Sequence, residues 1–130
     1  MTTDLTMLTA SAILTALLVL PDGLAMWTNW HVTEVLGNRQ APPPLPLWAD
    51  RAKRARANML ENFPHFATFV LTAHLTGASN HYTALGATIF FWSRLAHAVL
   101  YITGIWPPRA VAYFAGIAGE ILIVTQLIRT

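Results

Sequence analysis

A stripe of polar side chains on one predicted helix is the part of the chain best suited to chemistry. Its members are Arg51, Arg54, Asn58 and Glu61, and their spacing of i, i+3, i+7 and i+10 places them on one helix face. Only about a dozen largely apolar residues follow Phe63, whereas a membrane-spanning helix needs roughly twenty. We therefore expect the turn of Asn58 and Glu61 to lie at membrane depth, facing protein rather than lipid.

A second set of polar side chains lies further along the chain. Arg94, His97 and Tyr101 share a helix face by their spacing of i, i+3 and i+7, and Arg109 and Tyr113 follow the next turn. Arginine offers a rigid fork of donors for a carboxylate, and tyrosine offers one hydroxyl donor. If the two sets face each other, four arginines line a pocket that contains one or two acids. This composition predicts a site for an anion with carboxylates, reached from the cytoplasmic side.

The composition is that of a polytopic membrane protein. Of the 130 residues, 55% are hydrophobic and only 11% are charged, whereas soluble chains average about 25% charged residues. The net charge is only +2, and four of the eight basic residues lie between Arg51 and Arg56, so nucleic-acid binding is not expected. The chain has no cysteine. Any thiol chemistry must therefore use a thiol that arrives with a ligand.

Four apolar segments are predicted to form transmembrane helices in an all-α, up-down bundle. They cover residues of about 5–30, 48–75, 82–105 and 109–128. Pro21 and Pro64 lie inside the first two segments, where we expect kinks. Residues 31–48 are expected to form a loop, because Gly37, Asn38 and a proline-rich run disfavour a helix.

The distribution of basic residues predicts the orientation in the membrane. The first loop and the start of the second helix contain Arg39, Arg51, Lys53, Arg54 and Arg56, whereas both chain ends and the turn near residue 80 are poor in Lys and Arg. Basic loops stay on the cytoplasmic side. We therefore expect both termini outside and the basic loop in the cytoplasm.

Apart from the charged residues at the starts of the second and fourth spans, four ionisable residues other than histidine fall within the predicted spans, namely Asp22, Glu61, Arg94 and Glu120. Such residues are costly in lipid and face the interior of a bundle. At 1.5 Å rise per residue, Arg94 and Glu120 lie at about the same depth in antiparallel helices. We expect an Arg94–Glu120 ion pair or a shared polar layer there, which either belongs to a binding site or only locks the two helices together.

Simpler explanations exist for some of these polar residues. Arg51, Lys53 and Arg56 can serve only as topology or snorkelling charges, and Tyr113 can be interfacial packing. Three histidines lack metal-ligand spacing and nearby carboxylates, so no metal site is expected; they are His65, His74 and His81. Gly116 and Gly119 are interpreted as points of close helix packing.

Together these motifs resemble the MAPEG family, the membrane-associated proteins in eicosanoid and glutathione metabolism. The resemblance rests on Arg54-x-x-x-Asn58-x-x-Glu61-x-x-Pro64, on Arg94-x-x-His97-x-x-x-Tyr101, and on Pro-Arg109-x-x-x-Tyr113. It covers essentially the whole chain, so residues 1–130 are interpreted as one four-helix transmembrane domain.

The resemblance implies a homotrimer that binds glutathione between adjacent subunits in a bacterial inner membrane. It places Arg54, Asn58 and Glu61 on the glutathione peptide, and Arg94, His97, Tyr101 and Tyr113 around it. Arg109 would stabilise the thiolate as the catalytic residue. The implied activity is a glutathione-dependent transferase or peroxidase that acts on lipophilic electrophiles.

Two other functions remain open. One is a non-catalytic trimeric scaffold or lipid-binding protein with the same fold. The other is a proton or solute conduit, which is less favoured because four helices enclose little space and no half-helix break is evident.

Overall fold

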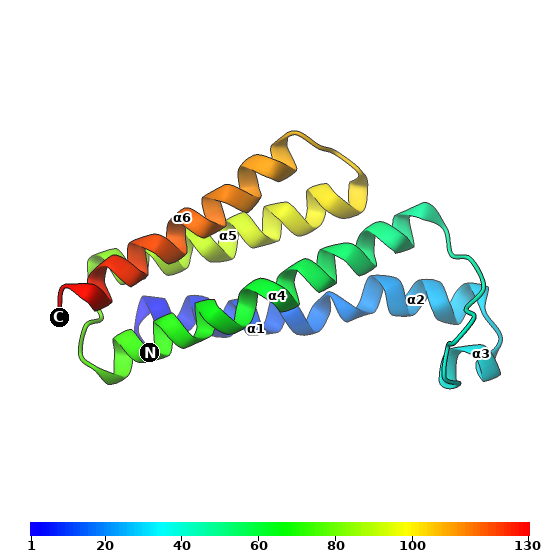
Figure 1. The fold of residues 1–130 in the computed structure, drawn as a ribbon, viewed down its shortest axis with the longest axis horizontal. Coiled ribbons are helices and arrows are strands. Elements are labelled where there is room, and N and C mark those ends of the chain that lie inside the picture. The colour runs from blue at the N-terminus through cyan, green and yellow to red at the C-terminus, as the bar shows by residue number, and fades with distance from the viewer.

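The computed structural model describes all 130 residues as helices joined by short connections (Figure 1). The helices are α1 (Thr3–Leu17), α2 (Val19–Asn29), α3 (Val32–Leu36), α4 (Leu47–Leu75), α5 (His81–Thr103) and α6 (Pro108–Ile128). Four long rods, the first made of α1 and α2, lie side by side, and both termini lie at the same end of the molecule (Figure 1).

The first rod is interrupted at Leu18, between α1 and α2. Pro21 lies in the first turn of α2; it has no backbone N–H, and its ring crowds the carbonyl four residues earlier, at Leu17. The helix is therefore interrupted one turn before the proline at which a kink was expected. By contrast, α4 is continuous from Leu47 to Leu75 although it contains Pro64.

The connection between α2 and α4 differs from the expected loop because it contains the short helix α3. A capping box starts this helix, with the Glu34 side chain accepting from the His31 backbone N–H at 2.9 Å. Gly37 and the prolines end helical structure only after this point. The sequence prediction was therefore wrong for residues 32–36 and failed because a single helical turn needs only a local cap.

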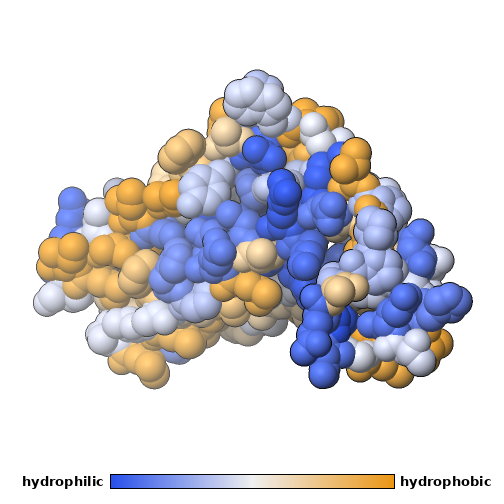
Figure 2. All heavy atoms as spheres, turned by 45° about the vertical axis from the view of Figure 1, so that its right-hand side comes forward, coloured by the Kyte–Doolittle hydropathy of each residue, from blue (hydrophilic) through white to orange (hydrophobic).

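Three segments are long and apolar enough to cross a membrane, namely Thr3–Asn29, α5 and α6. The remaining rod, α4, is longer, with 29 residues, but carries the basic cluster in its first half. The space-filling view shows hydrophilic side chains gathered in a band across the middle of one face, with hydrophobic side chains on either side (Figure 2).

Helices α5 and α6 approach each other closely through two glycines. A Cβ atom on Gly86 would lie 2.5 Å from the carbonyl oxygen of Gly119, and one on Gly119 would lie 2.6 Å from that of Gly86. Only hydrogen fits at both positions. The interpretation of Gly119 as a packing point is confirmed.

The core lies where α4 meets α5 and α6. The rings of Phe66 and Phe90 stack with centroids 3.7 Å apart, and Val70 and Ile123 are buried beside them. At the end that holds both termini, the buried Asp4 carboxylate accepts from the Ser79 hydroxyl at 2.8 Å. The core fixes the depth and rotation of α4 and α5, which determine where the polar residues meet.

Candidate functional site

Arg94 is the centre of the polar layer inside the bundle. Its side chain is only 1% exposed, although it carries a full charge. Its Nη1 donates to Asn58 Oδ1 at 3.0 Å and its Nη2 donates to Asn62 Oδ1 at 3.3 Å. Its Nε is buried without a partner. A buried guanidinium that is held by two neutral amides and makes no ion pair within the chain favours an anion nearby.

Close packing against α6 holds the Arg94 side chain in place. A Cβ atom on Gly116 would lie 2.9 Å from both Nε and Nη2 of Arg94 and 2.9 Å from Ser93 Oγ. The guanidinium carbon also lies 5.3 Å from the centroid of the Phe90 ring and 4.9 Å from that of Tyr113. These contacts are cation–π interactions. Gly116 is thus a packing point as expected, and what packs there is the arginine.

Next to Arg94, a small open pocket lies between the ends of α5 and α6. It has a volume of about 220 Å³ and is lined by His97, Tyr101, Arg109 and Tyr113, together with Phe114. The Arg109 guanidinium carbon lies 4.3 Å from the Tyr101 ring centroid. The His97 ring meets Tyr101 edge-on at 5.5 Å and lies 6.0 Å from the ring of Tyr113. The pocket therefore presents a cation and two phenol hydroxyls to an incoming ligand.

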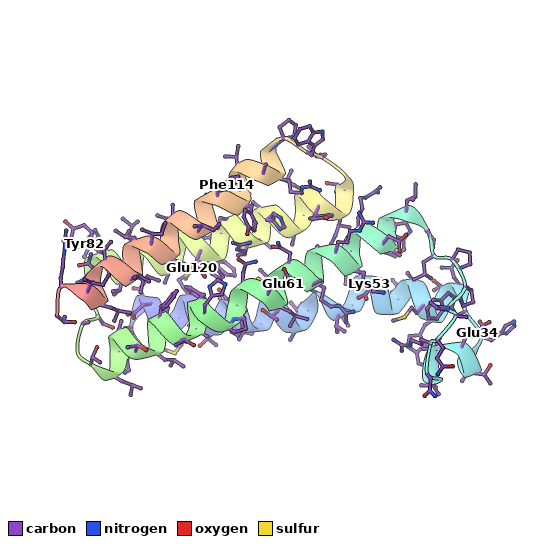
Figure 3. The ribbon with its side chains drawn as sticks, in the orientation of Figure 1. Glu34, Lys53, Glu61, Tyr82, Phe114 and Glu120 are labelled. Carbon is purple, nitrogen blue, oxygen red and sulfur yellow. The ribbon has the colours of Figure 1, made fainter.

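The stripe on α4 is only partly joined to this cluster. Asn58 reaches Arg94 as described, but Arg54 and Glu61 are exposed and make no ion pair within the chain. Figure 3 shows Glu61 midway along α4. The expectation that Glu61 faces the protein is wrong for the single chain, because the buried face of α4 is centred on Ala55, Met59 and Asn62.

Arg51 belongs to the frame of the site. Its Nε donates to the carbonyl oxygen of Ile102 at 3.0 Å, and its guanidinium lies beside Gly104, which ends α5 in a left-handed conformation with φ 79°. A cation at the C-terminus of a helix satisfies free carbonyls and interacts favourably with the helix dipole. Arg51 thus ties the basic end of α4 to the pocket end of α5.

The predicted Arg94–Glu120 ion pair does not form. Glu120 Oε1 instead lies 2.8 Å from His65 Nδ1, on α4. The two residues do share a polar layer, because their partners Asn62 and His65 are one turn apart on α4. The estimate that Arg94 and Glu120 lie at the same depth was right. The guanidinium group of Arg94, however, points toward α4 rather than along α6. The statement that His65 has no carboxylate nearby was also wrong.

A second ion pair joins the first rod to α4. Arg56 Nη2 lies 3.0 Å from Asp22 Oδ2, and the Asp22 carboxylate is buried. Arg56 is therefore not merely a topology charge. It compensates the one acidic residue inside the first predicted span.

The MAPEG family model matches residues 5–129, nearly the entire chain. The chain belongs to the MAPEG family. This membership and the three apolar segments establish an integral membrane protein related to glutathione and eicosanoid metabolism. No curated protein and no solved structure is significantly similar to this MAPEG chain.

Two of the site residues that the sequence analysis did not identify could have been found by the same spacing argument. Asn62 follows Asn58 by four residues and therefore shares its face of α4, so the same spacing argument could have included it. His65 extends that face by one further turn. The Asp22–Arg56 pair had no such signal, because its members are on different rods.

Proposed function

We propose that this MAPEG protein is a glutathione-dependent membrane transferase or peroxidase for lipophilic electrophiles. The observation that carries the proposal is the Arg109 side chain, held over Tyr101 in an open pocket beside the buried charge of Arg94. Family membership supports glutathione as the co-substrate. The chain has no thiol of its own, so the nucleophile must be supplied.

The proposed roles follow from the charges. Glutathione has two carboxylates and an amino group, so its carboxylates suit Arg94 and Arg54 and its amino group suits Glu61. His97, Tyr101 and Tyr113 would form the wall around the peptide, and Asn58 would contact it while orienting Arg94. Arg109 would lie by the sulfur.

Arg109 would act by favouring the thiolate. A guanidinium beside a thiol lowers the free energy of its ionised form, and the thiolate is the nucleophile. In conjugation, the thiolate attacks a carbon atom of the electrophile. A C–S bond forms as the bond between that carbon and its leaving group breaks. In peroxide reduction, the thiolate attacks one peroxide oxygen as the O–O bond breaks, and the alkoxide that leaves is protonated to the alcohol. A second glutathione thiol then attacks the resulting sulfenic acid, which gives the disulfide and water.

The apolar substrate would arrive through the membrane. Phe114 lines the pocket and is 67% exposed, and Val111, on the same helix, is 70% exposed. Phe114 is thus an apolar wall of the pocket, on a helix that is itself long and apolar enough to span the membrane. A lipophilic electrophile dissolved in the bilayer can reach the sulfur from that side.

The pocket of one chain is too small for the whole of glutathione. Its volume of about 220 Å³ is below the roughly 300–1,000 Å³ of typical ligand sites. Arg54 and Glu61 are exposed at the surface of the chain. These two facts support a homotrimer whose neighbouring subunits complete the site. We also propose four spans in a bacterial inner membrane, with both termini outside and the basic loop in the cytoplasm.

A glutathione titration tests binding. The purified protein in detergent is titrated with glutathione while its thermal stability is followed, with Arg109→Ala and Glu61→Ala alongside. Arg129→Ala is the matched control, since Arg129 is exposed at the opposite end of the chain. We expect saturable stabilisation that the first two variants lose and the control keeps. No response at millimolar glutathione would favour the non-catalytic scaffold.

A further inference from the structure

We infer that a second site, where α2, the proline-rich loop and the start of α4 meet, holds the headgroup of an anionic phospholipid. One acyl chain of this lipid would lie along α2. None of the residues that line this site lines the pocket of Arg109. The inference therefore stands independently of the proposed glutathione chemistry.

The headgroup pocket is polar and basic. It has a volume of about 250 Å³ and its charged lining consists of Asp22, Arg39, Asp50, Lys53 and Arg56. The pair of Arg56 and Asp22 is mutually neutralised, with 3.0 Å between Nη2 and Oδ2. Arg39 and Lys53 then face the single carboxylate of Asp50. The remaining charge of plus one matches a phosphodiester, which carries one negative charge.

Arg39 is held in position by its backbone and by α3. Its φ of 55° places it in the left-handed region, which is uncommon for residues other than glycine. Its Nε and Nη2 both donate to the carbonyl oxygen of Val35, at 2.9 Å and 2.6 Å. Its Nη1 makes no hydrogen bond within the chain. Backbone strain of this kind persists at ligand clamps, where the surrounding structure maintains it.

Two polar atoms in the residues that line the pocket lack partners. Asp22 Oδ1 and Trp30 Nε1 are buried and make no hydrogen bond. Leaving such groups unpaired costs roughly 1–3 kcal/mol each. A phosphate oxygen can accept from the indole N–H, and a headgroup hydroxyl or a water carried with it can donate to the carboxylate, after small shifts of flexible side chains such as Met26.

An apolar groove continues directly from this pocket. It has a volume of about 810 Å³ and shares Met26, Arg39 and Arg56 with the headgroup pocket. Its wall includes Leu20, Leu24 and Trp27, which are 59%, 62% and 55% exposed. A small basic pocket that opens into a large apolar groove fits a molecule with an acidic head and a long hydrocarbon chain.

The position of this junction favours a lipid of the surrounding membrane. The groove follows Val19 to Trp27 in the last part of the apolar segment Thr3–Asn29, and the basic pocket lies beside the same part but closer to its end, from Asp22 to Trp30 (Figure 3, near Lys53). Trp27, Trp30 and Trp48 surround the junction, as expected for the level of the headgroups. Phospholipids are the abundant amphiphiles at that level.

Native mass spectrometry of the full chain in detergent tests the inference. The protein is mixed with equal amounts of phosphatidylglycerol and phosphatidylcholine, and the retained lipid is counted. We expect the wild type to retain phosphatidylglycerol preferentially. Arg39→Gln should reduce this preference about fivefold, because one basic side chain near a lipid headgroup contributes about 1 kcal/mol. Trp30→Phe, which removes the indole N–H but keeps an aromatic ring, should reduce the total amount of retained lipid, because both lipids offer a phosphate oxygen to this donor.

Arg129→Gln is the matched control and should keep the wild-type preference, since it removes an exposed arginine far from the junction. Thermal unfolding of each variant verifies that it folds. Equal retention of the two lipids by the wild type would overturn the inference. So would an unchanged preference in Arg39→Gln together with undiminished lipid retention in Trp30→Phe. Preferential retention of added oleate would also overturn it and would assign the site to a free fatty acid.

Discussion

At the scale of single residues, the buried charges of this MAPEG protein are supported by groups from other helices. Arg94 is held by two asparagines of α4, Glu120 by His65 and Asp22 by Arg56. Each charge enters an apolar bundle at a considerable cost in solvation free energy, and a partner on another helix reduces that cost. Removing the partner should therefore affect stability more than removing an exposed charge.

The first prediction concerns Arg94. Arg94→Met keeps much of the side-chain volume but leaves the carbonyl groups of Asn58 and Asn62 without their donor. We expect the free energy of unfolding in detergent to fall by about 1–3 kcal/mol. Arg54→Met is the control, because Arg54 is exposed and unpaired, and it should change stability by less than about 0.5 kcal/mol. Equal losses in both variants would contradict the assigned role of Arg94.

The second prediction concerns the pair of His65 and Glu120. A double-mutant cycle with His65→Ala and Glu120→Gln should give a coupling free energy of about 0.5–3 kcal/mol, since the two side chains are in direct contact. Thermal or denaturant unfolding of the four proteins measures it. If the effects of the two single substitutions on the free energy of unfolding simply add, the two residues do not stabilise the protein as a pair.

The sequence predicted the residues of the polar layer better than their pairing. Helical periodicity and rise place Arg94 and Glu120 at one depth, but they do not fix the rotation of each helix about its axis. The rotation depends on packing at Gly86, Gly116 and Gly119. For this reason Arg94 contacts the two asparagines and Glu120 contacts His65, and the two charges do not pair with each other.

At the scale of helices, close approach determines the geometry of the site. The structure brings α6 onto α5 so tightly that Gly116 leaves room only for the Arg94 guanidinium. The long helices could be located from the apolar segments and their bordering prolines and glycines. The short helix α3 could not, because a five-residue helix has too little periodicity to distinguish it from a loop.

The third prediction uses two glycines with opposite surroundings. Gly116→Ala places a methyl group 2.9 Å from Arg94 and Ser93, so it should destabilise the protein by about 1–3 kcal/mol. Gly23→Ala meets nothing within 4 Å and should stabilise α2 by about 0.4–1 kcal/mol. Unfolding in detergent measures both. A loss of stability in Gly23→Ala with none in Gly116→Ala would refute the packing argument.

At the scale of the whole molecule, the single chain exposes much of what the proposed glutathione site needs. Arg54 and Glu61 face outward, the pocket near Arg109 is small, and α6 presents large apolar side chains such as Phe114. Nothing in the sequence alone shows which of these surfaces meets lipid and which meets another subunit. Association into a symmetric oligomer would cover some of these groups and enlarge the pocket.

The fourth prediction is therefore the assembly state. Native mass spectrometry of the purified protein should give a species of three chains, each of 14.3 kDa, because the exposed Arg54 and Glu61, which we propose to lie at membrane depth, need protein partners. Dilution in detergent should lower thermal stability if assembly and folding are linked. A stable monomer that still binds glutathione would contradict the proposed site between subunits.

The most direct test of the central claim measures the thiolate of bound glutathione. Ultraviolet difference absorbance at neutral pH should show a saturable thiolate signal when glutathione is added to the wild type, because the Arg109 guanidinium favours the ionised thiol. Arg109→Ala should lose this signal while keeping part of the thermal stabilisation from the peptide contacts. No thiolate signal in the wild type, or an undiminished one in Arg109→Ala, would contradict the account.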